Sequence, residues 1–576
     1  MYRRDITVTV RESRLFLGGT YPESCPPKGS EGRMSINVPD EPQLLPRSRY
    51  NATVRFIDRN MELGLGNKVA IYHDDGETTY EQLYQWVNRV GNGLRALGVQ
   101  VENRIALVCE DSVEFVASFF GAIKIGAVPV PLNTMWSPAD YIYVLNDSRA
   151  QVLIIEAQLW RQIARQRAAL PYLKHVLYLE REGELAAVDS MENAGIRIGN
   201  FYEIMKAQPC ELEPVATIYD DTAFWLYTSG STGKPKGVVH LQHDMEVAFH
   251  NYARSVLNIN EHDRTFSASK LFFAYGMGNG MYFALGTGGS TVLRRRRVSP
   301  ENVCDTVERY RPTLFFGVPT LYAAMLDWMD KTGKNPDFSS VRLCVSAGEP
   351  LPAAIYRRFR ERFGVDILDG IGSTEALHIY LSNRPGDIRP GSTGKVVPGF
   401  DVKIVNEYGE TVAANEPGQL LLKGDCLAQG YWNLHVQSKS RFNGEWYCTG
   451  DRYYQDEDGF FFYCGREDDM LKSGGIWVSP IEVESVILDH EAVLEAAVVG
   501  EKDENGIQKP VAYVVLRFEP DSVEEMEAEL RAYVRARLAH FKCPKRFIFM
   551  DDLPKTATGK IQRFKLRERS YSPTVN

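Results

Sequence analysis

Residues 228–237 read TSGSTGKPKG and could hold a phosphate group. The stretch contains three glycines, four hydroxyl side chains and the two lysines Lys234 and Lys236, and it directly follows the apolar run 223–227. A glycine-rich turn exposes backbone N–H groups, while hydroxyl and ammonium groups add donors and positive charge. It is not an ordinary P-loop, because only two residues separate Gly230 from Gly233 where that motif has four. These residues alone favour a phosphate loop, with a solvated linker as the alternative.

Helices and short apolar strands alternate around this loop. The spacing of apolar residues predicts a helix over 80–99, a buried strand over 103–111 and a helix running into a strand over 114–132. The same alternation returns over 291–350. It is typical of a layered α/β architecture with largely parallel sheets.

The pattern changes towards the carboxyl end. Strands shorten and turns multiply over 391–464, which predicts a small antiparallel barrel. A compact α+β unit of about 110 residues then follows, long enough for an independent domain. Residues 1–33 are rich in glycine, proline, serine and charge, which predicts a poorly ordered extension. We therefore expect an amino-terminal domain over 34–467 and a carboxyl-terminal domain over 468–576.

Composition bounds the class of protein. With 576 residues, 44% apolar and 24% charged, the chain is expected to form two or more folded domains. A net charge of -9 and a pI near 5.7 argue against nucleic acid as the main partner. Nine cysteines without a CxxC pair favour a reducing cytoplasm. Neither a signal peptide nor a membrane-spanning run is predicted, since charges interrupt the apolar stretch 104–132.

Seven motifs, in order, carry a resemblance to a known family. YTSGSTGKPKGVVH resembles the signature loop of the adenylate-forming superfamily, which includes acyl-CoA synthetases, peptide-synthetase adenylation domains and luciferases. SAGEPLP, DGIGSTE, GYWN, WYCTGD, GREDD and PKTATGK follow in the expected order, so the resemblance covers about residues 50–570. It implies a large AMP-binding domain of two layered α/β subdomains plus the small barrel, and a mobile α+β domain that turns about a hinge at Asp468.

The resemblance also implies roles for single residues. Lys560 would bridge the carboxylate and the α-phosphate during adenylation, and Glu375 would hold Mg²⁺ beside the phosphates of ATP. Asp451 would accept from both ribose hydroxyls, with Arg466 beside it. From the residues alone, a surface carboxylate, a structural Asp–Arg pair or a surface lysine remains the alternative. The full implied ATP-binding set is Thr228, Ser229, Gly230, Ser231, Thr232, Gly233, Lys234, Lys236, Glu349, Asp369, Thr374, Asp451 and Arg466. The implied lining of the coenzyme A tunnel is Lys472, Ser473, Gly474 and Gly475.

The segment KLFFAYGMGNG (270–280) predicts the acid substrate. Its aromatics, interrupted by alanine and glycine, suit a flat cavity, or else a buried helix start packed with aromatics. Together with 370–383 and 130–151 it looks like benzoate–CoA ligases and their hydroxybenzoate relatives. That resemblance implies an aryl pocket lined by Ala274, Tyr275, Ala347, Gly348, Ile371 and His378, although His378 could also be an ordinary core histidine.

The expected function is an AMP-forming aryl-CoA ligase that uses an aromatic acid, MgATP and coenzyme A, as a monomer or homodimer. A hydroxybenzoate, aminobenzoate or heteroaryl ligase remains open, as does an aryl-acid adenylating enzyme that loads a separate carrier protein. A nucleotide-binding regulatory protein is disfavoured, because Lys560, Glu375 and Asp451 are all present.

The run RRRR at 294–297 lies outside these motifs and follows a predicted strand. We expect a solvated sheet edge that discourages strand pairing, with contact to the phosphates of coenzyme A as the alternative.

Overall fold

The computed structural model describes residues 49–180, 195–229, 234–466, 470–473, 476–502, 508–555, 561–563 and 565–567. Five predicted features lie outside these residues: the extension over 1–33, the loop residues Gly230–Gly233, the hinge Asp468, the pair Gly474–Gly475 and Lys560.

A nine-stranded sheet forms the largest layer. Its strand order is β16-β15-β14-β13-β12-β10-β11-β1-β2. All pairings from β14 to β1 are parallel, and antiparallel strands close both ends. The bounds are β1 Val69–His73, β2 Gly76–Thr79, β10 Arg264–Ser267, β11 Ser290–Leu293, β12 Leu314–Gly317, β13 Leu343–Ser346, β14 Ile367–Gly372, β15 Ile379–Ser382 and β16 Lys395–Val396. The parallel sheet predicted from the alternating pattern is therefore confirmed.

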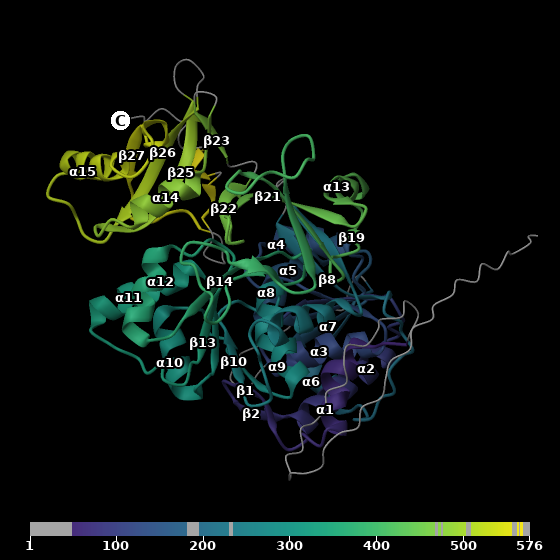
Figure 1. Ribbon diagram of the computed structural model, residues 1–576. Coiled ribbons are helices and arrows are strands. Elements are labelled where there is room, and N and C mark those ends of the chain that lie inside the picture. Colours follow the sequence, from purple (N-terminus) through teal and green to yellow (C-terminus); the bar gives the residue numbers. More distant parts are fainter. Residues whose placement is uncertain are drawn as a thin grey trace, which may run out of the picture. The chain divides into compact units, whose positions relative to one another are not determined.

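Alternating side chains of these strands reach two different cores. Leu314 and Phe316 of β12 join the largest apolar cluster, while Phe315 between them packs under the helices of the other face. Three helices cover that face: α10 (Pro300–Tyr310), α11 (Pro319–Thr332) and α12 (Ala353–Phe363). They lie together beside β13 and β14 in Figure 1. The central strand β12 (LFFG) is buried along its whole length because both faces of the sheet are covered there.

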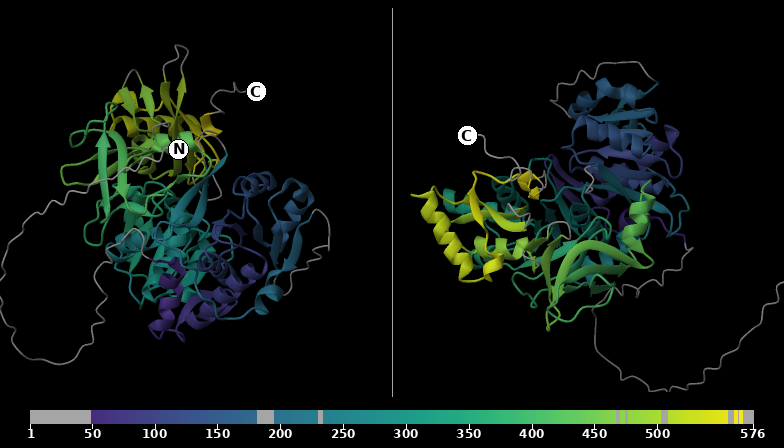
Figure 2. Two further views of the ribbon diagram at one scale, coloured as in Figure 1. Left: turned by 90° about the vertical axis from the view of Figure 1, so that its right-hand side faces the viewer. Right: turned by 90° about the horizontal axis from the view of Figure 1, so that it is seen from above.

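A second, five-stranded sheet is parallel throughout and has the order β4-β3-β5-β6-β7. Its strands are β3 Arg104–Val108, β4 Val128–Pro131, β5 Val152–Glu156, β6 His175–Leu179 and β7 Arg197–Asn200. One face packs on α4 (Pro138–Asp147) and α5 (Ala157–Ile163), and the other on α2 (Tyr80–Ala96), α3 (Val113–Lys124) and α6 (Phe201–Lys206). Figure 2 shows most of this layer in blue.

Glycines allow α2 and α3 to pack closely. A Cβ on Gly121 would lie 2.9 Å from the carbonyl oxygen of Val87, and one on Gly91 would lie 3.2 Å from that of Gly121. Because both helices contribute to the core between the two sheets, this close packing joins the sheets into one body.

Two antiparallel sheets follow the layered part. β8 (Thr222–Ser229), β9 (Pro235–Leu241) and β19 (Gly430–Tyr431) form one, in the order β19-β9-β8. The other has the order β17-β18-β21-β20, with β22 also on β21, and it confirms antiparallel structure within 391–464. Its strands are β17 Phe400–Val405, β18 Gly418–Gly424, β20 Phe442–Asn443, β21 Trp446–Gln455 and β22 Phe461–Arg466.

The carboxyl-terminal part is α+β, as predicted. It contains the hairpin β23 (Leu471–Ser473) and β24 (Ile476–Val478), and a sheet of β25 (Val493–Lys502), β26 (Gln508–Leu516) and β27 (Arg546–Phe549). Helices α14 (Pro480–Leu488) and α15 (Val523–Arg535) share a core with β25 and β26. Across the described part of the chain, no helix combines the length and apolar character needed to cross a bilayer.

Shorter helical segments complete the described structure. They are η1 Val54–Asp58, α1 Arg59–Glu62, η2 Ala164–Ala169, α7 Asp244–Ala248, η3 Phe249–Arg254, α8 Ala274–Met277, η4 Gly278–Tyr282, α9 Phe283–Thr287, α13 His435–Arg441 and η5 His540–Lys542.

The arginine run 294–297 does not border a sheet edge, so that expectation is wrong. It follows β11, which is paired on both sides, with β10 and with β1. Arg294 is buried and its Nε lies 2.7 Å from Asp74 Oδ1, while Arg295 Nη2 lies 2.9 Å from Asp75 Oδ1. Only the last two arginines of the run are exposed. Arg294 and Arg295 therefore connect the chain after β11 to the turn after β1.

Candidate active site

The described ends of the glycine-rich stretch lie on the paired strands β8 and β9. Thr228 pairs with Lys236 and Ser229 pairs with Pro235, and β9 continues outward to pair with β19. A solvated linker would not be flanked by paired strands, so that interpretation is wrong. The hairpin holds the ends of the loop in place, which is what a phosphate site requires.

Lys236 and Glu375 form a partly buried ion pair, although they are 139 residues apart in the chain. Lys236 Nζ lies 3.1 Å from Glu375 Oε1, and the Tyr431 hydroxyl donates to the same oxygen at 2.7 Å. Burial alone would raise the pKa of Glu375, but the charge of Lys236 and the tyrosine hydrogen bond outweigh it and lower the pKa. Glu375 is therefore an ionised carboxylate at neutral pH. Lys234, by contrast, is exposed, with its ammonium 5.1 Å from the ring centre of Tyr143.

Two residues without a predicted role position this pair. Tyr431 lies in the motif GYWN, for which no contact was predicted, and its ring centre lies 3.9 Å from Lys236 Nζ. His240, at the end of β9, bonds Asp244 Oδ2 through Nδ1 at 2.7 Å and the Thr374 carbonyl through Nε2 at 2.8 Å. The second bond ties the hairpin to the residue before Glu375. A histidine within a buried apolar strand is the signal that could identify His240 from the sequence.

Asp451 and Arg466 are opposite each other on β21 and β22. Asp451 Oδ1 lies 3.1 Å from Arg466 Nη1, and the arginine also donates to the Thr449 carbonyl at 3.3 Å. Burial would lower the pKa of Arg466, but Asp451 more than compensates and raises it. The predicted pair is thus formed, and its geometry suits either a structural ion pair or an anchored acceptor for ribose hydroxyls.

The carboxyl ends of β13 and β14 bring the next predicted residues together. Ser346 pairs with Asp369, so Ala347 and Gly348 emerge beside DGIGSTE. Gly348 has a φ of +95°, a conformation that favours glycine. Asp369 is buried, and burial raises its pKa well above the usual value. Its Oδ2 accepts from the Leu351 N–H at 3.3 Å, whereas Oδ1 has no hydrogen-bond partner among the described residues.

The base of the Lys560 loop contacts this region. Ile561, the next residue, donates its N–H to Glu349 Oε1 at 3.2 Å. A bridge between Lys555 and Ile561, and a hydrogen bond from the Gln562 N–H to the Pro554 carbonyl at 2.7 Å, close the loop at its base. The structure thus places the neighbour of Lys560 against the motif SAGEPLP, while Lys560 itself lies outside the described residues.

Tyr275 and His378 meet in a buried aromatic group. The Tyr275 hydroxyl donates towards the carbonyls of Gly317 and Val345, at 3.2 and 3.3 Å, which ties α8 to the ends of β12 and β13. The His378 ring lies 4.5 Å from that of Phe283, 5.2 Å from that of Tyr252 and 5.8 Å from that of Tyr275, measured between centres.

Burial decides the charge of His378. The residue is 3% exposed, and burial lowers its pKa to about 3, so the imidazole is neutral at physiological pH. A Cβ on Gly278 would lie 2.8 Å from His378 Nε2, so this glycine leaves the space that the ring occupies. Ala274 and Ala347 are buried, and Ile371 is half-buried. The structure confirms the second description of 270–280, a helix start packed with aromatics, while the flat cavity stays a prediction.

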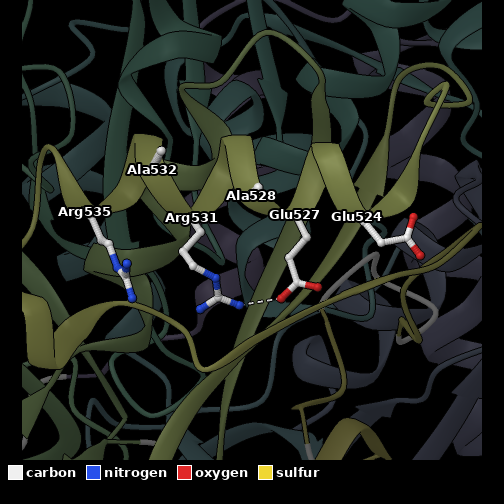
Figure 3. Close-up of a pocket in the computed structure, with 6 residues that line it drawn as sticks. All are labelled: Glu524, Glu527, Ala528, Arg531, Ala532 and Arg535. Atoms are coloured by element: carbon white, nitrogen blue, oxygen red, sulfur yellow. Dashed lines mark hydrogen bonds and ion pairs between the residues drawn. The ribbon is translucent and has the colours of Figure 1, made fainter.

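A pocket of about 520 Å³ lies along α15, away from the predicted site residues (Figure 3). Its lining is Glu524, Glu527, Ala528, Arg531, Ala532 and Arg535, all from one helix. Arg531 is ion-paired with Glu527 within the lining. Because one helix supplies its whole lining, this pocket does not have the residues from several elements that a substrate site requires.

Two family models match the chain. A model described as "AMP-binding enzyme" matches residues 60–432, and one described as "AMP-binding enzyme C-terminal domain" matches residues 482–560. The chain belongs to the AMP-binding enzyme family. The first match includes the β8–β9 hairpin, Glu375 and His378, and the second ends at Lys560.

Individual relatives of this AMP-binding enzyme extend over nearly its whole length. The benzoate–CoA ligase of Thauera aromatica is 45% identical over 526 residues, which cover 90% of this chain and 96% of that protein. The crystal structure of the anthranilate CoA ligase AuaEII in complex with anthranoyl-AMP is 42% identical, with a TM-score of 0.84, over 91% of this chain and 97% of that one. A benzoate CoA ligase from Burkholderia xenovorans LB400 is 41% identical, with a TM-score of 0.80, over 90% and 100% of the two chains.

Proposed function

We propose that this AMP-binding enzyme is an AMP-forming aryl-CoA ligase of the benzoate type. An aromatic carboxylate and ATP give an acyl-adenylate and pyrophosphate, and the thiol of coenzyme A then displaces AMP to give the thioester. The observation that carries the proposal is the meeting of two unlike groups at the ends of β12–β14: an ionised cluster around Glu375 and a neutral aromatic group around His378. The similarity to benzoate and anthranilate ligases supports an aryl acid.

The ionised cluster suits the triphosphate of ATP. Attack of a carboxylate on the α-phosphate brings anions together, so cations must neutralise the developing charge. Lys236 would supply positive charge on one side of the phosphates. Asp451 and Arg466 would orient the ribose, while Asp369 and Glu349 would line the rest of the nucleotide site.

Glu375 fits a magnesium ion. Its carboxylate is ionised and held in place by Lys236 and Tyr431, and hard oxygen ligands are those that Mg²⁺ prefers. No group of three histidine, cysteine, aspartate or glutamate side chains gathers as a metal site within the described ranges. One carboxylate suffices for an ion that keeps most of its waters and binds phosphate oxygens. Bound Mg²⁺ would supply charge neutralisation at the phosphates.

The aromatic group suits the ring of the acid. Ala274, Ala347 and Gly348 are small and would leave room for an aromatic ring, while the ring of Tyr275 is fixed by its hydroxyl contacts. His378 is neutral, so it would not compete with Lys560 for the carboxylate. A wall of rings and small residues excludes long flexible chains better than it distinguishes substituents on a benzoate. Hydroxybenzoates and aminobenzoates are accordingly alternative substrates.

The second half-reaction needs a different face of the carboxyl-terminal domain. We propose a rotation about Asp468 that withdraws Lys560 and brings the β23–β24 hairpin, with Lys472–Gly475, to the site as the coenzyme A tunnel. The backbone pairing of Lys472 with Trp477 and of Ser473 with Ile476 would give this tunnel a firm edge. A reducing cytoplasm accords with the free thiols of the eight described cysteines.

The decisive experiment mixes purified protein with benzoate, MgATP and coenzyme A. AMP, pyrophosphate and benzoyl-CoA should form in equal amounts. Formation of ADP and phosphate would contradict the proposal. A panel of benzoate, 2-aminobenzoate, hydroxybenzoates and acetate, followed by pyrophosphate release, ranks the acids.

A separate carrier protein or an amine is the alternative acceptor. It would be favoured if benzoate supported ATP–pyrophosphate exchange while coenzyme A gave no thioester.

A further inference from the structure

Lys270 opens the segment that leads into α8, and its ammonium group is enclosed by fixed acceptors. Lys270 Nζ donates to the Arg294 carbonyl at 2.6 Å and to the Arg296 carbonyl at 3.4 Å, and it lies 3.4 Å from Asp111 Oδ2. Its side chain is 19% exposed. The lysine therefore joins the acid-binding segment to the end of β11 and to the loop before α3.

Asp111 holds the next residue of the same segment. Its Oδ1 accepts from the Leu271 N–H at 2.9 Å, across 160 residues of sequence, while Oδ2 faces Lys270. Asp111 is 4% exposed, so burial raises its pKa, and Lys270 and the Leu271 N–H act in the opposite direction. One buried carboxylate thus fixes both a side chain and the backbone at 270–271.

The backbone of Lys270 is in direct contact with α8. A Cβ on Gly276 would lie 2.0 Å from the Lys270 carbonyl oxygen and 2.4 Å from that of Ser269. The Phe273 N–H also donates to the Lys270 carbonyl, at 3.0 Å. Because no space separates the Lys270 peptide from the helix, a displacement of one shifts the other. Ala274 and Tyr275 lie on that helix.

The backbone carbonyls that accept from Lys270 belong to the arginine run, which is itself held in place. Asp74 accepts from the Arg295 N–H at 2.9 Å and is ion-paired with Arg294 at 2.7 Å, so the backbone that receives Lys270 is fixed to the turn after β1. Arg294 Nη1 also donates to the Thr306 hydroxyl of α10 at 3.1 Å.

We propose that Asp111 and Lys270 are positioning residues that set the place of α8, and with it the fit of Ala274 and Tyr275 to the aryl acid. The proposal rests on the proposed function. Neither side chain needs to touch the substrate. They act through the backbone of 270–271. Lys270 is anchored to the backbone of the arginine run, which Asp74 holds in place.

The test compares Lys270→Met, Asp111→Asn and Asp111→Ala in steady-state kinetics with benzoate and with 2-aminobenzoate. Displacement of a pocket wall by a fraction of an ångström should raise KM for the acids by about tenfold, with KM for ATP unchanged, since misplacement of about 1 Å can cost about 10²-fold. The ratio of kcat/KM between the two acids should change as well. Asp111→Ala should have a larger effect than Asp111→Asn, which retains an oxygen acceptor for the Leu271 N–H.

Lys124→Met is the matched control. Lys124 is a buried lysine of α3, and its Nζ lies 2.8 Å from Asp58 Oδ2. This control should lower Tm without changing KM for either acid. Lys270→Arg, which keeps the charge, should restore KM for benzoate towards the wild-type value. The inference is overturned if the Lys270 and Asp111 variants lower only Tm, as the control does, or change KM for ATP and acid together.

Failure of the proposed function gives a different result. A wild-type enzyme that releases no pyrophosphate with any aryl acid would contradict the function itself. An active wild type with unaltered acid kinetics in Lys270→Met and Asp111→Asn would contradict only the positioning role. Should Asp111→Ala not fold, these two milder variants still decide the question.

Discussion

Glu375 and His378 lie three residues apart and are equally buried, yet their ionisation is opposite. Glu375 has Lys236 and the Tyr431 hydroxyl beside it, which lower its pKa and keep it charged. His378 is surrounded by the rings of Tyr252, Tyr275 and Phe283, and burial keeps it neutral. Burial disfavours charge at both positions, so it is the presence of a counter-charge that decides. The nucleotide side and the acid side of the site differ in this respect.

Asp369, on the preceding strand β14, extends the comparison. It is as buried as Glu375 and six residues before it, but burial raises its pKa, and only backbone N–H donors act in the other direction. Glu375 thus differs from Asp369 in having a lysine within reach of its carboxylate.

The largest effect is expected on the charged side. Lys560→Ala should lower the rate of adenylation by about 10²–10³-fold, because it removes a cation from the developing charge. Pyrophosphate release from benzoate and MgATP measures this step. Thioester formation from supplied benzoyl-AMP and coenzyme A is the control and should be nearly unchanged. Equal loss in both assays would contradict a rotating domain.

Glu375→Gln tests whether the charge on Glu375, which His378 lacks, is needed for stability and for Mg²⁺ binding. The variant keeps the shape of the side chain but leaves Lys236 without its counter-charge, which should destabilise the fold by about 3 kcal/mol. It should also weaken the binding of Mg²⁺, so the Mg²⁺ concentration that gives half-maximal pyrophosphate release should rise. Unchanged Mg²⁺ dependence would remove Glu375 from the metal site. Asp387→Asn, at the exposed pair with Lys395, is the control for loss of an ordinary ion pair.

His378→Phe should change the pH dependence of stability. The unfolded imidazole binds a proton below its ordinary pKa of 6.5, whereas folded His378 does so only near its pKa of about 3. The folded state therefore loses stability as pH falls from about 6.5 towards 3, with a slope of at most about 1.4 kcal/mol per pH unit.

Urea unfolding of wild type and His378→Phe between pH 8 and pH 5 measures this difference. Buried carboxyls with raised pKa, such as Asp369, act in the opposite direction and are common to both proteins. Their contribution cancels in the comparison. If the free energy of unfolding changed with pH in the same way in both proteins, His378 would bind its proton equally well in the folded and unfolded states.

The smallest effect is expected at the end of the arginine run. Arg296→Gln should change the free energy of unfolding by no more than about 0.5 kcal/mol, because the residue is exposed. Arg294→Gln, which removes the buried ion pair with Asp74, should cost about 3 kcal/mol. Thermal or urea unfolding compares the two. Similar losses in both would contradict the distinct surroundings that the structure gives them.

Contiguous residues determined much of this protein. The apolar spacing over 80–132 and 291–350 predicted the helices and parallel strands, because periodicity reports which faces of an element are buried. Glycines and hydroxyls at 228–237 predicted a phosphate loop, because turn chemistry is local. The motif series predicted the family in the same way.

Contacts between distant segments were decided by the tertiary structure. The sequence does not state that β11 lies inside the sheet, so the arginines after it were assigned to an edge. Nor does it pair Lys236 with Glu375, or Asp111 with the Leu271 N–H. Strand order sets these distances, and it follows from how all the apolar faces pack at once. The charge on Glu375 and its absence on His378 depend on those neighbours, so they too were fixed only by the fold.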